Sequence, residues 1–222
     1  MVKRGVTIGT YDTAAQGWTL TGWSLSAPQF VSNLVDIPGR IDGPLDLSAA
    51  VTGGEPRYQA RTFTATLERS DGDRLSREAA INTMVNWLDG WRQNIVLPDD
   101  AAHYITGRVS VARVYNDPAH ASVTVTATCD PWRYANEETV VNLAATAAAQ
   151  KAVFVNSGRR TAVPVLVVTG DGSLNLQYGT ASWSLSAGTY QLPDILLTQG
   201  SHEITYSGDG MALTATYREA VL

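Results

Sequence analysis

The sequence predicts a mainly β protein of two domains, an α+β first domain with one packed helix and a projecting β-ribbon, then a β-sandwich or jelly roll. Three observations lead to this prediction. Apolar and polar residues alternate through most of the chain, one segment alone has clear helical periodicity, and short evenly spaced strand patterns follow residue 135. We therefore expect the domains to span residues 1–135 and 136–222.

The composition is that of a folded protein without a basic surface. Of 222 residues, 44% are hydrophobic and 17% are charged. Residues 1–135 contain 12 basic and 14 acidic residues and residues 136–222 contain 4 and 7, which disfavours tight binding to nucleic acid or anionic membranes. The lone cysteine, Cys129, excludes an intrachain disulfide, and the apolar stretch Val163–Val168 is too short to span a bilayer. We expect a protein that folds in the cytoplasm.

Strand patterns flank one helix in the first half. Trp18–Leu25 alternates around Gly22, which suggests a bulge, and Tyr58–Leu67 alternates as a half-buried strand. Ile105–Val114 and Val123–Thr128 predict a hairpin with a turn at residues 116–118.

The helix is predicted between Ser76, a candidate N-cap, and Gly90, a typical stop signal. Glu78 is expected in its first turn, and its apolar positions recur at helical spacing. They are Ile81, Met84, Val85 and Leu88.

The second half consists of short strand patterns separated mostly by glycine and aspartate turns, which is typical of a β-sandwich. The predicted strands are Val163–Thr169, Leu174–Tyr178, Ser182–Leu185, Ile195–Leu197, Ser201–Tyr206 and Ala212–Arg218.

Val35–Leu47 is the most informative segment. It reads V-D-I-P-G-R-I-D-G-P-L-D-L, with two glycines and two prolines between apolar residues. Proline fixes φ, glycine permits positive φ, and acidic side chains close local turns, so the pattern predicts an extended ribbon folded back by turns. It is too polar and too rich in breakers to fill a core, and we expect it to project and to need a partner.

No catalytic or metal-binding pattern is evident. Nucleophilic catalysis needs a base beside a Ser or Cys, but only His103, His120 and His202 are present, without a G-x-S-x-G motif. Cys129 ends an apolar strand, where a buried, inert thiol is the expected state. Asp99 and Asp100 follow Pro98 and are expected in a solvated turn. We therefore predict no enzyme activity, no cofactor and no metal site.

Aromatic residues of the second half leave a carbohydrate-binding alternative open. Beta-strand alternation sends about half of them into the core, and the rest could form a platform that stacks on sugars. The residues concerned are Tyr178, Trp183, Tyr190, Tyr206 and Tyr217.

A succession of motifs resembles the distal tail proteins of long, non-contractile-tailed bacteriophages, the siphovirus tail-component family. The D-I-P-G-R-I-D-G-P-L-D-L run is similar to the family's I-P-G-R-D-G-x-L-D-L signature, although Ile41 is inserted. Further similarities are the Y-x-x-R of Tyr58–Arg61, the helix end Trp87–Gly90, the Y-x-x-G-R of Tyr104–Arg108, the closing Cys129–Tyr134, and, in the second half, Asn156–Gly158, Pro164–Thr169 and Tyr217–Glu219.

This resemblance implies a non-enzymatic virion protein at the phage tail tip. The family forms a hexameric ring between the tail tube and a tail-associated or fibre hub, with a channel for DNA. Its second domain is a galectin-like sandwich on the outside of the ring. Paired rings and a weak contact with host wall glycan are further options. A tail-tube subunit and a carbohydrate-binding module remain the alternatives.

Two sets of residues are predicted to matter. In a closed ring each subunit offers two different faces, and the ribbon would supply one of them, with Arg40 as a charge-assisted anchor. The subunit-contact residues are Ile37, Pro38, Gly39, Arg40, Asp42, Gly43, Leu45 and Leu47, and the residues that close the domain are Cys129, Asp130, Pro131 and Trp132.

Overall fold

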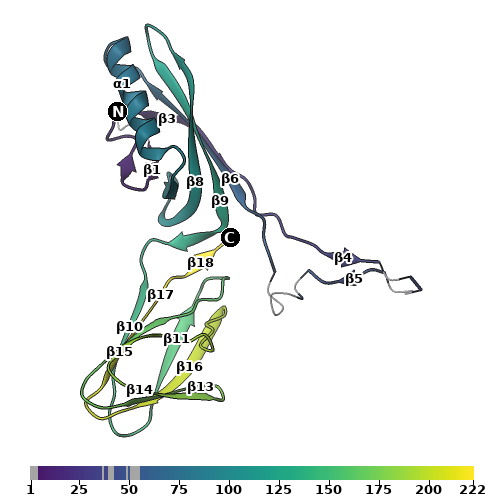
Figure 1. Cartoon of the computed structure of the whole chain (residues 1–222), viewed down its shortest axis with the longest axis vertical. Helices are drawn as coiled ribbons and strands as arrows, with labels where there is room; N and C mark the ends of the chain where they lie inside the picture. The colour runs from purple at the N-terminus through teal and green to yellow at the C-terminus, as the bar shows by residue number, and fades with distance from the viewer. Residues whose placement is uncertain (1–4, 37, 40–42, 49, 51–55) are drawn as a thin grey trace. The chain divides into compact units, whose positions relative to one another are not determined.

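The computed structural model describes residues 5–36, 38–39, 43–48, 50 and 56–222. The chain divides into two compact units, Met1–Arg133 and Tyr134–Leu222, each with its own hydrophobic core. Strands dominate both units and the described residues form one α-helix, so the predicted mainly β fold is confirmed (Figure 1). Nowhere in the described ranges is a helix long and apolar enough to cross a membrane.

The first unit is built on a sheet with the strand order β2-β1-β7-β8-β9-β6-β3. The interior strand β6 pairs antiparallel with β3 on one side and β9 on the other. The register of β3 shifts between Leu20 and Gly22, where the sequence predicts a bulge. The strands are β1 (Thr7–Ile8), β2 (Tyr11–Asp12), β3 (Thr19–Leu25), β6 (Arg61–Arg69), β7 (Arg92–Leu97), β8 (Asp100–Asn116) and β9 (Ala121–Ala135).

Alternation along β6 determines which side chains enter the core. Arg61, Phe63, Ala65 and Leu67 are buried, as the period of two predicts. The strand begins three residues later than expected, because Tyr58 instead forms an isolated bridge with Phe30.

The helix α1 (Arg74–Leu88) packs its apolar face on this core through Ile81, Met84 and Leu88. Its N-cap is Asp73 rather than Ser76, because the Asp73 carboxylate accepts the backbone N–H of Ser76 at 2.8 Å. The first turn consequently contains no acidic residue, and the placement of Glu78 there was wrong. Gly90 follows the C-cap with φ +78°, a left-handed conformation that favours glycine.

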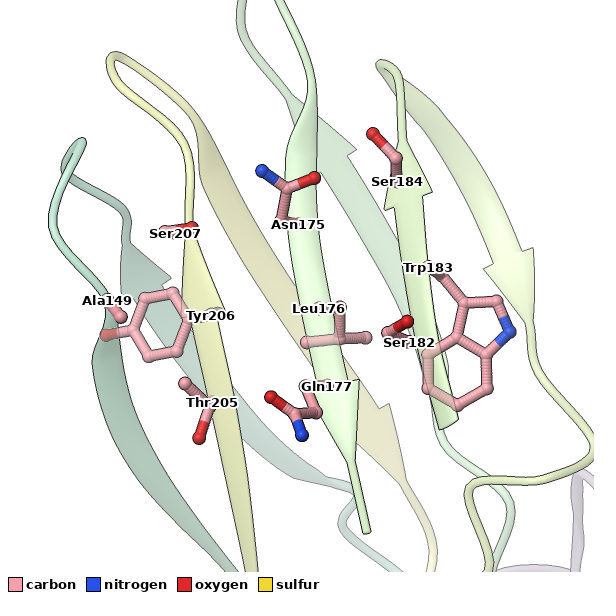
Figure 2. Close-up of a pocket in the computed structure, with 10 residues that line it drawn as sticks. All are labelled: Ala149, Asn175, Leu176, Gln177, Ser182, Trp183, Ser184, Thr205, Tyr206 and Ser207. Atoms are coloured by element: carbon pink, nitrogen blue, oxygen red, sulfur yellow. The ribbon is translucent and has the colours of Figure 1, made fainter. Parts of the chain in front are cut away.

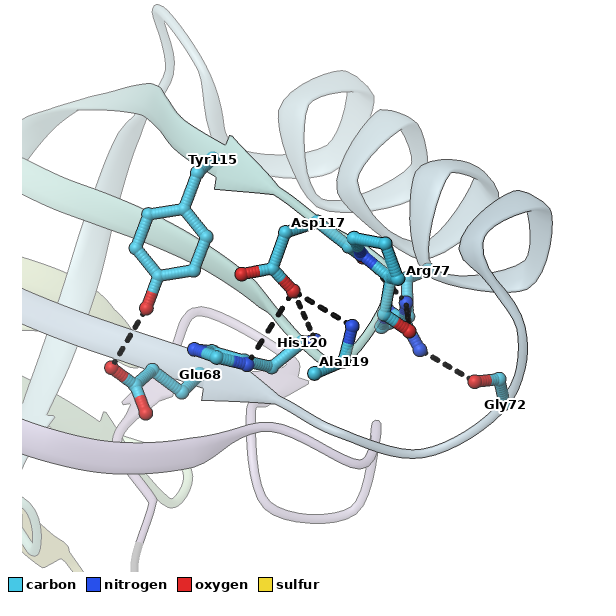
Figure 3. A network of polar contacts seen from close by, with 8 residues as sticks. Glu68, Gly72, Arg77, Tyr115, Asp117, Ala119 and His120 are labelled. Atoms are coloured by element: carbon cyan, nitrogen blue, oxygen red, sulfur yellow. Dashed lines mark hydrogen bonds and ion pairs between the residues drawn. The ribbon is translucent and has the colours of Figure 1, made fainter.

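A buried arginine ties the start of the helix to the turn between β8 and β9 (Figure 3). Arg77 is only 1% exposed, and its guanidinium donates to the carbonyls of Gly72 at 2.5 Å, Asp117 at 2.8 Å and Pro118 at 3.0 Å. The Asp117 carboxylate accepts the backbone N–H groups of His120 and Ala119, which lowers the pKa of that carboxyl. The side chains of Arg77 and Asp117 therefore both stabilise the turn between β8 and β9.

The second unit is a sandwich of two four-stranded sheets, β10-β17-β12-β15 and β11-β16-β13-β14, with the core between them. Ile195–Leu197 is not a strand; Leu197 makes only an isolated bridge with Ala162. The galectin-like topology stays a prediction. The strands are β10 (Thr139–Ala144), β11 (Gln150–Asn156), β12 (Val165–Thr169), β13 (Leu174–Tyr178), β14 (Ala181–Leu185), β15 (Gly188–Gln191), β16 (Gly200–Ser207) and β17 (Ala212–Tyr217). The short strand β18 (Ala220–Val221) belongs to neither sheet of the sandwich and pairs with β9.

Candidate subunit-contact ribbon and its anchor

The two ends of the Val35–Leu47 segment lie in a two-stranded ribbon outside the main sheet. Strand β4 (Leu34–Val35) pairs antiparallel with β5 (Leu45–Asp46). Beyond the paired residues, the Leu47 N–H donates to the Asn33 carbonyl at 2.8 Å. Figure 1 shows this hairpin as a separate two-stranded element between β3 and β6 in the chain. The four paired residues give it a defined register.

The ribbon presents apolar side chains to solvent. Leu34 is 58% exposed and Val35 is 39% exposed, and none of the described residues between 26 and 60 belongs to the core of the first unit. Adjacent exposed aliphatic side chains on an element without a core of its own are typical of a surface that another chain covers.

Five of the eight predicted contact residues are described in the structure, and they differ in exposure. Pro38, Gly39 and Gly43 are exposed, and both glycines have positive φ, +87° and +84°, as the turn prediction requires. Leu45 and Leu47 are partly buried. Three further predicted residues lie outside the described residues: Ile37, Arg40 and Asp42.

An aromatic stack anchors the base of the ribbon to the closing motif of the domain. The ring of Tyr58 lies 6.2 Å from that of Phe30 and 5.6 Å from that of Trp132, centroid to centroid, both edge to face. Backbone bonds from Val31 to Arg57 (2.9 Å) and from Gln59 to Gln29 (2.8 Å) hold the two ribbon arms together. The structure thus brings the Tyr58-x-x-Arg61 motif into contact with Trp132 of the closing motif, which is far away in the sequence.

Arg61 forms a second link to the closing motif. Its guanidinium is 7% exposed and donates to the carbonyl of Ser26 at 2.7 Å and, more weakly, to that of Pro131 at 3.5 Å. Burial, reinforced by the nearby Arg133 charge, lowers the pKa of Arg61. The spacing Tyr58-x-x-Arg61 therefore has a structural reason: both side chains contact the segment that closes the domain.

Cys129 is buried near the end of β9, and the neighbouring Asp130 forms an ion pair. Cys129 is 1% exposed, and burial raises the pKa of its thiol to about 11, so it is protonated at neutral pH, as expected of an inert thiol. Gly107 lies against it: a Cβ on Gly107 would be 2.5 Å from the Cys129 Sγ. The Asp130 carboxylate pairs with Arg92 at 2.6 Å on the surface.

Among the described residues, no group of three His, Cys, Asp or Glu side chains could hold a metal ion. Burial would raise the pKa of Asp100, but its hydrogen bond with His103 (2.8 Å) and the charge of Arg133 (2.9 Å) outweigh that effect and lower it. Asp100 is thus engaged in structural contacts, and Asp99 lies in the β7–β8 turn.

One hollow of the second unit is lined by uncharged side chains, polar ones together with the apolar Leu176 and Trp183. It has a volume of about 330 Å³ and lies over β13, β14 and β16 (Figure 2). The strand alternation directs the side chains of Asn175, Gln177, Ser182, Ser184, Thr205 and Ser207 outward there.

The aromatic residues considered for sugar stacking all contact the core of the second unit. Tyr206 and Tyr217 are buried in it, and the other three pack against it while partly exposed. The tyrosine hydroxyls find local partners: Tyr217 donates to the Val155 carbonyl at 2.6 Å, and Tyr178 lies 2.8 Å from His202 Nδ1. Trp183 and Tyr206 also line the hollow over β13, β14 and β16, so the carbohydrate alternative stays a prediction.

An α+β unit with a projecting, anchored ribbon, followed by a β-sandwich, is the architecture expected of a phage distal tail protein. The structure resembles the crystal structure of the SPP1 Dit protein, described as a paradigm of the hub adsorption apparatus in phages that infect Gram-positive bacteria. The TM-score is 0.67 with 14% sequence identity, and the match covers 96% of this chain and 98% of that one. The chain therefore has the Dit fold over nearly its whole length, and the resemblance found in the sequence is confirmed at the level of the fold.

Other comparisons add little. The virion of a native gene transfer agent particle matches 49% of this chain and 79% of that chain at 14% identity, but its TM-score of 0.23 is too low to support a common fold. No protein-family model matches the sequence, and no curated protein matches it.

Proposed function

We propose that this chain is a structural, non-enzymatic subunit of a phage tail tip, which joins the tail tube to the tail-associated or fibre hub. The observation that carries the proposal is the likeness to the SPP1 Dit protein across both units, with a TM-score of 0.67. The chain would be made in the host cytoplasm and then reside in the virion. Its mildly acidic first unit suits a conduit through which DNA passes without being retained.

The proposed assembly is a closed ring of about six copies, in which the ribbon of one subunit binds its neighbour. Exposed Leu34 and Val35 support this role, because burying them against a partner removes apolar surface from water. The stack of Phe30, Tyr58 and Trp132 supports it too, because an anchored ribbon loses less conformational entropy on binding than a free one. Arg40 would add a charge-assisted bond to the neighbour.

The test compares the wild-type chain with a deletion of Ile37–Leu47, by light scattering and negative-stain imaging. The deletion removes most of the ribbon but leaves its anchors Tyr58, Arg61 and Trp132 in place, so the variant is expected to stay folded. We expect the wild type to form rings with a central hole, about six times the monomer mass of 23.8 kDa, and the variant to be monomeric with an unchanged circular dichroism spectrum.

Three other outcomes would each contradict part of the proposal. Long tubes of the wild type would identify a tail-tube subunit. A monomeric wild type would contradict self-assembly into a ring. Rings formed by the deletion variant would exclude the ribbon as the contact element.

A further inference from the structure

Six neutral polar side chains form two rows across the strands β16, β13 and β14 of the second unit. In each row a side-chain amide of β13 lies directly between two hydroxyl residues of the neighbouring strands. The two rows lie two residues apart along each strand, on the outer face of the sheet (Figure 2). They are Ser207–Asn175–Ser184 and Thr205–Gln177–Ser182. We name this set the hydroxyl–amide grid.

The grid is built on side chains of the core. Leu174 and Leu176 are at most 1% exposed, and strand alternation therefore directs Asn175 and Gln177, which lie between and after them, to the outer face. With strands about 4.8 Å apart and a rise of about 3.4 Å per residue, the grid spans about 10 Å across the strands and about 7 Å along them. Because paired strands fix its backbone, the grid is formed before any ligand arrives.

The polar groups of the grid are not used within the sheet. Among the hydrogen bonds of the described chain, the Gln177 amide makes only a long contact of 3.4 Å with the Gly179 carbonyl, and the Asn175 amide makes none. The opposite sheet differs, since the Asn142 amide accepts the Thr214 hydroxyl there at 2.9 Å. The amides of the grid are therefore available to a ligand.

The surroundings of the grid determine which ligand chemistry fits. The hollow above it has a volume of about 330 Å³, and Leu176, Trp183 and Tyr206 also line it. Beside the grid, the Lys151 Nζ and the Glu203 Oε1 lie 2.7 Å apart and neutralise each other. A phosphate, carboxylate or amine in the hollow would lose hydration without gaining an unpaired counter-charge.

We propose that the hydroxyl–amide grid binds a neutral mono- or disaccharide unit. Sugar hydroxyls both donate and accept hydrogen bonds, and so do the amides and hydroxyls of the grid. The volume of the hollow is at the lower end of the roughly 300–1,000 Å³ of small-molecule sites, which suits a ligand of this size. All of these residues belong to the second unit of one chain, so the site does not depend on ring assembly.

Saturation-transfer NMR and titration calorimetry on the full-length chain test the site. The probes are four neutral disaccharides, lactose, maltose, cellobiose and chitobiose, and the acidic digalacturonate. We expect at least one neutral disaccharide to bind with a Kd of about 1 mM or below, and digalacturonate to bind at least about five-fold more weakly. The proposal is overturned if no neutral disaccharide binds at about 10 mM, or if the acidic probe binds equally well.

A pair of variants assigns the binding to the grid. Asn175→Ala combined with Gln177→Ala removes both central amides, and we expect the Kd to rise at least about five-fold with an unchanged circular dichroism spectrum. Asn142→Ala, on the outer face of the opposite sheet, is the matched control and should leave the Kd unchanged. Undiminished binding by the double variant, or an equal loss in the control, would overturn the grid as the site.

The solution mass of the same samples separates this proposal from the ring. Rings that bind no saccharide contradict the grid alone, and monomers that bind one contradict ring assembly alone.

Discussion

At the scale of single residues, the tightest constraint is the close approach of Gly107 to β9. A Cβ at residue 107 would lie 2.5 Å from the Cys129 Sγ and 2.9 Å from the Thr128 carbonyl oxygen. The backbone oxygen cannot move without disturbing the sheet, so Gly107→Ala should lower the free energy of unfolding by about 1–3 kcal/mol. Urea unfolding measures this.

The control for that substitution is Gly22→Ala. Gly22 also lies in a strand of the same sheet, but a Cβ added there would have no other atom within 4 Å. We expect a change of less than about 0.5 kcal/mol for this variant. Equal losses at both positions would mean that strand propensity, and not the contact with Cys129, explains the effect.

Cys129 and Gly107 show which features of the fold can be predicted from the sequence and which cannot. That Cys129 is buried and inert follows from its position at the end of an apolar strand, and the structure confirms it. That Gly107 has to be glycine does not follow, because it depends on which residue of β9 lies beside it. Strand register is a tertiary property, and a sequence without an alignment carries no direct signal for it.

At the scale of elements, the connection between α1 and the β8–β9 turn depends on Arg77. Arg77 is 1% exposed and its guanidinium donates to three carbonyls, so truncating it removes three hydrogen bonds and leaves a cavity. Arg77→Ala should therefore cost about 3 kcal/mol or more of unfolding free energy. The matched control is Arg74→Ala, an exposed arginine three residues earlier, for which we expect a loss below about 0.5 kcal/mol in the same urea titration.

Element positions were predictable where side-chain periodicity sets them. The buried faces of α1 and β6, and the strand Leu174–Tyr178, agree with the sequence analysis. The cap of α1 was misplaced because Asp73 and Ser76 are both good N-caps, and the choice depends on where the chain enters the helix. The strands β10, β11 and β15 were missed. Their Val, Thr, Phe and Tyr residues favour strands, but β10 and β11 flank an Ala-rich stretch and β15 has only four residues.

At the scale of the whole molecule, the base of the ribbon and the closing motif are packed against each other. The sequence analysis singled out both segments, but it gave no reason why they should belong together. The structure supplies one: Tyr58 stands between Phe30 of the ribbon base and Trp132, and Arg61 bonds to the carbonyl of Pro131. The strand end that closes the first unit thereby fixes the base of the element proposed to reach the neighbouring subunit.

If the ribbon binds the neighbouring subunit through its apolar side chains, a charge in place of Leu34 should abolish ring assembly without unfolding the chain. Leu34 is 58% exposed, so Leu34→Asp should leave the thermal unfolding temperature nearly unchanged, yet it would bury an unpaired carboxylate in the assembled state. Leu75→Asp is the control, because Leu75 is 78% exposed on α1 of the same unit. We expect light scattering to give a monomer for Leu34→Asp and the wild-type mass for Leu75→Asp. Rings formed by Leu34→Asp would place the subunit contact elsewhere on the first unit.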